Sequence, residues 1–158
     1  MKSFTIFNKL AFTFALTIMG IALNAQDVMV FKIASPAGAA GTYTLYRSAF
    51  GPQDSDEILD KGIKVADPLL GCSTLTNDQT GSITFVDRGT CNFVDKVKNA
   101  QLAGSVAVII CNDDRDPINP GGDDPGDITI KSFLMEKPDC DKIKVALGAG
   151  AVNGNIVV

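Results

Sequence analysis

No histidine and no tryptophan occur among the 158 residues, and tyrosine occurs only twice. The absence of histidine excludes Ser-His-Asp and Cys-His hydrolases, histidine-ligated zinc and histidine general-base catalysis. With so few Trp and Tyr side chains, there are few aromatic platforms on which sugars or bases could stack. Positive charge is also in the minority, fourteen basic residues against eighteen acidic ones, which argues against a nucleic-acid-binding protein. The composition therefore favours a protein that is not an enzyme.

Long apolar runs are confined to the N-terminus. Residues 10–23 form an uncharged run that follows two lysines, and the sequence becomes polar after Ala25. The run is too short for a comfortable membrane span, and no later stretch approaches eighteen apolar residues. We predict that residues 1–25 are a signal peptide and that residues 26–158 form one exported domain with a net charge of −6, secreted or periplasmic and free of the membrane.

All four cysteines lie in the predicted exported part, at positions 72, 91, 111 and 140. An even number of cysteines in an oxidising compartment favours two disulfides. A four-cysteine zinc site normally brings two closely spaced pairs, whereas the gaps here are 19, 20 and 29 residues. The spacing itself leaves three disulfide connectivities open.

Alternating and continuous apolar patterns predict several strands and two helices. The first helix begins after Asn92 and ends before Gly104, and the second covers residues 139–147. The strand, helix and strand within residues 82–110 predict a βαβ unit with parallel strands. The fold class is α/β (mixed α+β) in a single domain. The expected strands are residues 28–33, 42–47, 62–65, 82–87, 106–110, 128–135 and 155–158.

One segment carries a recognisable pattern. A strand leads into Arg88-Gly-Thr-Cys-Asn-Phe93, then a helix with Asn99-Ala100, then Ala103-Gly104 and an apolar strand that ends in Asn112. This pattern resembles the protease-associated (PA) domain, and Ile130–Phe133 resembles its downstream block, with Lys131 where the family commonly has proline. Further matches at residues 41–43, 50–52 and 71–72 are similar to the extended bacterial secreted form.

The resemblance covers nearly all of residues 26–158, with a core motif over about residues 70–147. It implies a compact mixed β-sheet or open barrel flanked by two main helices. It also implies a non-catalytic module without a cofactor that binds a secreted protein or peptide, for example as the accessory or substrate-recognition module of a peptidase. In similar sorting receptors the Arg-Gly-x-Cys loop lies close to bound peptide, which would place Arg88, Gly89, Thr90 and Cys91 at a recognition edge. A fragment of a larger secreted peptidase is an alternative.

Residues near the motif invite individual expectations. Gly89 can take a tight turn that a side chain would resist, and Phe93 can insert under the sheet. We expect Lys96 and Lys98 to be solvated helix charges. Arg88 has two interpretations: it bridges backbone carbonyls of neighbouring loops, or it presents its guanidinium to a partner's carboxylate.

The acidic loop after Asn112 suggests two other functions. The adjacent carboxylates of residues 113–114 and 123–124 could be an acid and a base, but neighbours on a Gly/Pro-rich loop rarely face each other across a substrate. A calcium-dependent module would use Asp113, Asp114 and Asp116, but the loop lacks the spacing of an EF-hand. Solvated loop acids are the simpler interpretation, so no metal is expected.

The order of the predicted elements selects one disulfide connectivity. Cys91 precedes the first helix, and the chain after Cys72 can turn back toward it. Cys111 ends one strand, and Cys140 opens a helix that follows another strand, so the two cysteines meet if those strands are neighbours. We predict Cys72–Cys91 and Cys111–Cys140, and the PA-domain resemblance implies the first pair as well.

Overall fold

The computed structural model describes residues 28–123 and 126–158, so the predicted signal peptide lies outside the described residues. Within the described ranges, no helix has the length and apolar character needed to span a membrane. The helices are α1 (Phe93–Leu102) and α2 (Lys137–Ala149). The strands are β1 (Val30–Ile33), β2 (Gly41–Thr44), β3 (Tyr46–Arg47), β4 (Ile58–Val65), β5 (Ile83–Asp87), β6 (Ala107–Cys111), β7 (Lys131–Met135) and β8 (Asn153–Val157).

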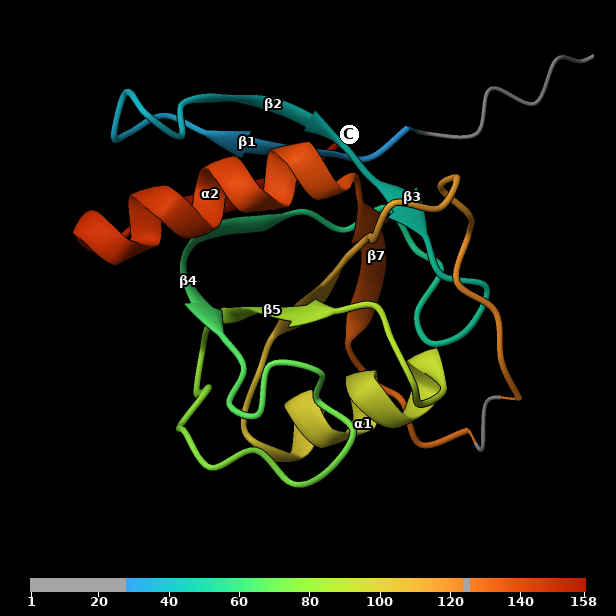
Figure 1. Cartoon of the computed structure of the whole chain (residues 1–158). Coiled ribbons are helices and arrows are strands. Elements are labelled where there is room, and N and C mark those ends of the chain that lie inside the picture. The colour runs from blue at the N-terminus through green and yellow to red at the C-terminus, as the bar shows by residue number, and fades with distance from the viewer. Residues whose placement is uncertain (1–27, 124–125) are drawn as a thin grey trace, which may run out of the picture.

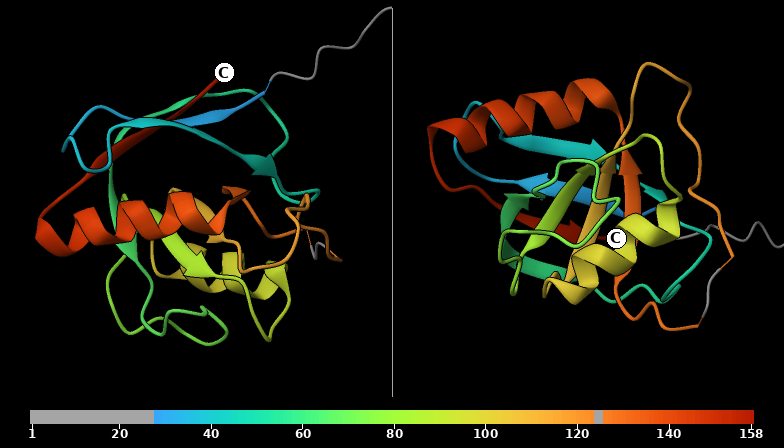
Figure 2. Two further views of the ribbon diagram at one scale, coloured as in Figure 1. Left: turned by 45° about the horizontal axis from the view of Figure 1, so that its top comes forward. Right: turned by 60° about the horizontal axis from the view of Figure 1, so that its bottom comes forward.

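The strands form one mixed sheet in the order β2-β1-β8-β4-β5-β6-β7-β3. Its two end strands, β2 and β3, are separated by the single residue Leu45. Thr44 pairs with Val30 of β1, whereas Tyr46 pairs with Leu134 of β7, so the chain changes partner at Leu45. The predicted single strand at residues 42–47 is therefore split. This exchange makes the sheet curl into a nearly closed barrel (Figure 2).

The predicted βαβ unit is confirmed. Strands β5 and β6 are parallel with Ile83 opposite Ala107, and α1 connects them. Strands β4 and β7 extend the parallel part of the sheet on either side. Helix α1 is followed by Gly104, whose φ of +95° lies in the left-handed region that favours glycine after a helix.

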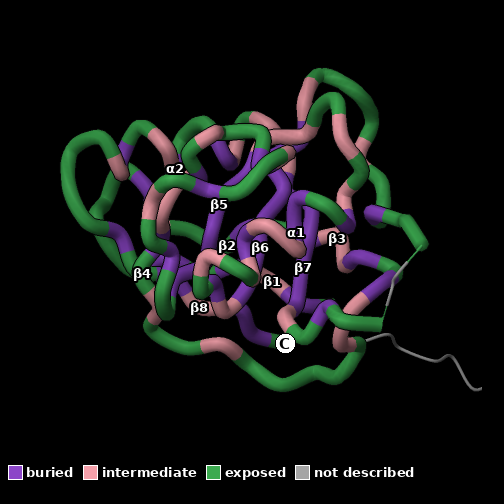
Figure 3. The backbone as a smooth tube through the Cα atoms, turned by 90° about the horizontal axis from the view of Figure 1, so that it is seen from below, coloured by how far each residue is buried: buried purple, intermediate pink, exposed green. Residues whose placement is uncertain are grey.

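Alternate residues of the central strands enter two separate cores. Phe85 and Ile109 pack in the barrel with Ile143 of α2, whereas Val86 and Val108 belong to the cluster that covers α1. This alternation follows from the two-residue period of a strand. Figure 1 shows α2 above β5 and α1 below it, and Figure 3 shows the buried strands ringed by exposed loops.

Several element boundaries differ from the predictions by two or more residues, and three of them concern the elements around the two cores. Strand β4 begins at Ile58, because its first half pairs with β8 and only its second half with β5. Strand β7 begins at Lys131, and Ile128 packs instead in the cluster that covers α1. Helix α2 begins at Lys137 with Pro138 in its first turn, so Asp139 lies inside the helix and does not cap it.

The structure joins Cys72 to Cys91 and Cys111 to Cys140, with Cα–Cα distances of 5.6 Å and 5.7 Å. The second pair meets because β6 and β7 are neighbours and Cys111 lies opposite Met135, just before α2. These are the pairs that the order of the elements predicts. One disulfide therefore ties a loop to the start of α1, and the other ties the end of β6 to α2.

Candidate functional site

The turn between β5 and α1 faces the loop that follows β6 across an open groove of about 690 Å³. Arg88, Gly89, Thr90 and Cys91, the four residues singled out from the sequence, all line this groove. The remaining lining comes from residues 92–95 and 98, and from residues 115 and 121–123 of the loop. We call this surface the motif groove.

Arg88 connects the two walls of the motif groove. Its guanidinium donates to Oδ1 of Asn112 at 2.7 Å and to the backbone carbonyl of Asp116 at 3.3 Å, and it lies 3.9 Å from the carboxylate of Asp113. Only 10% of its side chain is exposed. Of the two interpretations of Arg88, the bridging one describes this geometry, because the guanidinium is engaged within the domain.

Phe93 lies beside Arg88 and not under the sheet. The guanidinium carbon of Arg88 is 5.8 Å from the centre of the Phe93 ring, which is only half-buried against the cluster covering α1. The prediction that Phe93 inserts under the sheet is therefore wrong. Val94 takes the buried position at the start of α1 instead.

The expectation that Lys96 is a solvated helix charge is also wrong. Lys96 is fully buried, and its ammonium donates to the carbonyl of Leu70 at 2.6 Å and lies 3.5 Å from Sγ of Cys72. Burial lowers the pKa of Lys96 below its ordinary value, although the carboxylate of Asp87 opposes this effect. Lys98, in contrast, is half-exposed and pairs with Asp127 at 2.5 Å. Only Lys98 is thus a solvated helix charge.

The helical spacing of α1 could have indicated from the sequence that Lys96 is buried. Lys96 lies four residues before the buried Ala100, and residues at this spacing share one face of a helix. The sequence gives no sign, however, that the loop with Leu70 folds over this face of α1. Asn99, one turn further on, donates to the carbonyl of Gly71 at 2.9 Å. Helix α1 therefore holds this loop with two side chains.

Gly89 does not take the expected strained turn, but it lies close to the side chain of Leu70. Its backbone is not in the left-handed region. A Cβ at this position would lie 2.7 Å from Cδ2 of Leu70, closer than side chains approach without a shift. Leu70 is 36% exposed, and its neighbour Leu69 is 41% exposed. The absence of a side chain at Gly89 thus leaves room for the Leu70 side chain beside the motif groove.

The acidic loop does not gather its carboxylates. Asp113 accepts hydrogen bonds from Nε of Arg115 at 2.9 Å and 3.0 Å, and these bonds lower the pKa of the Asp113 carboxyl. Asp114 and Asp116 are exposed. Across residues 28–123 and 126–158, no three His, Cys, Asp or Glu side chains form a group that could hold a metal ion. The three calcium candidates are therefore not brought together around a common centre.

A family model for the PA domain matches residues 59–143. The chain belongs to the PA domain family. It is 32% identical over 103 residues to the PRADC1-like protein of Drosophila melanogaster, covering 61% of this chain and 53% of that protein. It is 29% identical over 160 residues to vacuolar-sorting receptor 1 of Pisum sativum, covering 90% of this chain and 26% of the receptor.

The fold of this PA domain is also found in solved structures. An aminopeptidase from Aneurinibacillus sp. strain AM-1 superposes with a TM-score of 0.63 at 23% identity, over 84% of this chain and 30% of the aminopeptidase. The chain thus corresponds to about half or less of the length of these relatives. PA domains are accessory domains that occur in peptidases and in receptors. The expected family and fold are confirmed.

The family match covers the motif groove but not the whole barrel. It begins within β4 and ends within α2, so β1, β2, β3 and β8 lie outside the matched residues. The groove, both disulfides and Lys96 all fall inside the match. The part that this PA domain shares most clearly with its family is thus the parallel half of the sheet with its two helices.

Proposed function

We propose that this PA domain is an exported, non-catalytic recognition module that binds an extended segment of a peptide or secreted protein in the motif groove. The observation that carries the proposal is the rigid attachment of the groove. Cys91 is tied to Cys72 by a disulfide, and the Cys72 loop is held by the buried Lys96. Recognition residues on irregular backbone gain affinity when a scaffold holds them in place before binding.

The charges of the motif groove support binding over chemistry. Arg88, Lys98 and Arg115 each pair with a carboxylate of the domain, which leaves them as positioned donors and not as groups poised to exchange protons. The whole chain has no histidine. Exposed Thr90 and the apolar Leu70 add a hydroxyl and an apolar contact at the edge. This mixture suits a peptide backbone with an apolar side chain.

The partner we propose is a separate secreted protein, and a peptidase that this module serves is the leading candidate. The support is the family membership and the likeness to a sorting receptor. An extracellular or periplasmic location is supported by the signal-like residues 1–25 and by two disulfides, which persist in oxidising compartments.

The test is to select peptides from a random phage-display library with the wild-type domain and then to measure their affinity for two variants. Thr90→Trp fills the motif groove, whereas Val145→Trp adds the same bulk to a 78% exposed position on α2. We expect Thr90→Trp to weaken binding at least about tenfold and Val145→Trp to leave it unchanged. Equal affinity for both variants, or reproducible hydrolysis of the peptides by the purified domain, would contradict the proposal.

A further inference from the structure

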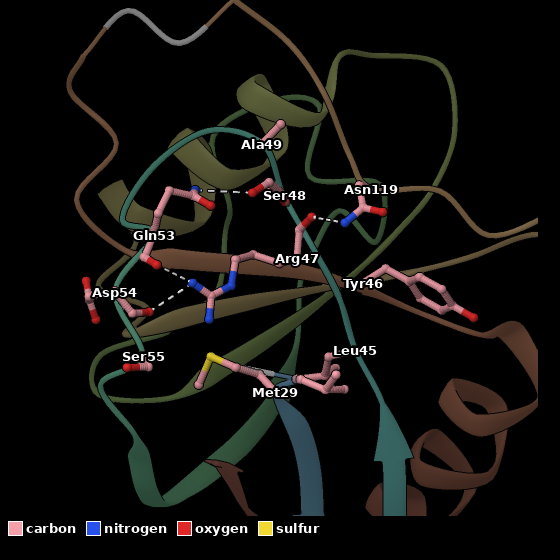
Figure 4. Close-up of a pocket in the computed structure, with 11 residues that line it drawn as sticks. Met29, Leu45, Tyr46, Arg47, Ser48, Ala49, Gln53, Asp54, Ser55 and Asn119 are labelled. Atoms are coloured by element: carbon pink, nitrogen blue, oxygen red, sulfur yellow. Dashed lines mark hydrogen bonds between the residues drawn. The ribbon is translucent and has the colours of Figure 1, made fainter. Parts of the chain in front are cut away.

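A second pocket of about 610 Å³ lies between the start of β1 and β3, outside the motif groove. Met29 and Leu45, which are 3% and 6% exposed, supply its apolar floor, and Arg47, Gln53 and Asp54 stand around it (Figure 4). The two hollows lie on either side of one loop, since residue 119 lines this pocket and residues 121–122 line the motif groove. We call it the Arg47 pocket.

The guanidinium of Arg47 is only partly satisfied by the domain. One nitrogen, Nη1, donates to the backbone carbonyls of Gln53 and Asp54. A guanidinium has five N–H donors, and neither Nε nor Nη2 bonds to another described residue. Arg47 also forms no ion pair within the described ranges, because the Asp54 carboxylate is held by Lys131. Arg47 thus brings a cation with unused donors to the wall of an open pocket.

Within residues 28–123 and 126–158, no carboxylate pairs with this cation. The ion pair with Lys131 lowers the pKa of the Asp54 carboxyl and thereby keeps it ionised and occupied. The ammonium of Lys131 also donates to the backbone carbonyl of Asp56. The Asp54 carboxylate therefore pairs with Lys131, whereas Arg47 reaches only the backbone carbonyls of Gln53 and Asp54. The unpaired positive charge favours an anionic ligand, and the planar Nε and Nη2 donors match a carboxylate in a bidentate arrangement.

We propose that the Arg47 pocket binds the C-terminal carboxylate of a peptide whose last residue is apolar. Arg47 and Met29 line the same pocket (Figure 4), so the anion site and the apolar floor share one hollow. An apolar C-terminal residue carries a carboxylate and an apolar side chain on the same Cα. It can therefore pair with the Arg47 guanidinium and contact the apolar floor at the same time. An Asp or Glu side chain within a peptide offers a carboxylate but no apolar group beside it for the pocket floor. Any polypeptide that ends in an apolar residue carries such a terminus, and hydrolysis of a peptide bond creates new ones.

The test uses the ε-methyl resonances of ¹³C-methionine-labelled protein. Met29 lies in the pocket and reports on its occupancy, whereas Met135 is fully buried in the barrel core and is an internal control. The probes are N-acetylated tripeptides ending in leucine, with either a free carboxylate or a C-terminal amide, and an amidated tripeptide that carries glutamate. We expect the free acid to shift Met29 but not Met135, and the two amides to shift neither.

Two variants test whether the shift of the Met29 resonance depends on Arg47 or on the motif groove. Arg47→Gln should abolish the Met29 shift, whereas Lys98→Gln, in the motif groove, should leave it unchanged. The comparison of the free-acid peptide with its amide uses the wild-type protein. Its result is therefore valid even if Arg47→Gln disturbs the loop at Gln53 and Asp54.

Three results would overturn the proposal. They are no shift of Met29 with the free acid, an equal shift with the leucine amide, and an equal shift with the glutamate peptide.

Discussion

The ammonium of Lys96 lies 2.6 Å from the carbonyl oxygen of Leu70, 26 residues earlier in the chain. This hydrogen bond joins the first half of α1 to the loop that carries Cys72. Because Cys72 is linked to Cys91 in the groove wall, the Lys96–Leu70 contact and the disulfide act on the same loop from two sides. The β5–α1 turn in the groove wall is therefore linked, through this loop, to the buried ammonium of Lys96.

Replacement of that charge tests its contribution to stability. Lys96→Met should lower the free energy of unfolding by about 1–2 kcal/mol, because the carbonyl of Leu70 loses a charged donor. Lys98→Met is the matched control on the same helix, and removal of its exposed ion pair with Asp127 should cost less than about 0.5 kcal/mol. Denaturant unfolding measures both values, and equal losses would contradict the structural role of Lys96.

The pH dependence of stability gives an independent readout of Lys96. Its pKa in the folded domain lies below the ordinary value of 10.5, so unfolding takes up a proton in the interval between the two values. Within that interval, the free energy of unfolding should rise with pH in the wild-type protein relative to Lys96→Met. Unfolding curves at a series of alkaline pH values measure this difference, and a constant difference would show that Lys96 titrates normally.

Arg88 links the β5–α1 turn to the acidic loop, and its loss should affect binding through both walls of the groove. We expect Arg88→Ala to weaken capture of the selected peptides more than Lys98→Ala, while both variants stay folded by circular dichroism. Arg88→Lys should not restore affinity, because Nη1 at the far end of the guanidinium donates both bonds, to Asn112 and to Asp116, and the shorter lysine side chain ends before that point. Unfolding of Arg88→Ala would instead assign Arg88 a purely structural role.

The two disulfides should account for much of the stability of this small domain. They join residues separated by 19 and 29 positions, and loops of this length correspond to about 3–4 kcal/mol each in the chain-entropy model. Reduction should therefore lower the melting temperature markedly. Peptide mapping without reductant should recover Cys72 linked to Cys91 and Cys111 linked to Cys140. Any other linkage, or free thiols in exported protein, would contradict the pairing.

Export itself is testable at the N-terminus. Sequencing of the exported protein should return a chain that begins at or near Gln26, because the residue before it is small and follows an apolar run. A chain that still begins with Met1 would contradict the predicted cleavage.

Local patterns in the sequence were sufficient to predict the β5–α1–β6 unit with its turn at residues 88–91, and the order of the elements predicted the pairing of the cysteines. The reason is physical: a strand, a helix and a parallel strand within thirty residues leave few ways to pack, and right-handed connection is strongly favoured. The turn between them must then lie at the strand-to-helix edge. The barrel also follows from the family resemblance.

Other features depend on contacts between distant segments, and only the tertiary structure decided them. Helical periodicity cannot reveal that the Leu70 loop covers Lys96, and an alternating strand pattern cannot show that the chain changes partner at Leu45. The Arg47 pocket requires β1, β3 and the residue 53–55 loop to converge. Such convergence is set by the closure of the sheet, because a side chain acquires its burial, its partners and its unused donors only when segments far apart in sequence pack around it.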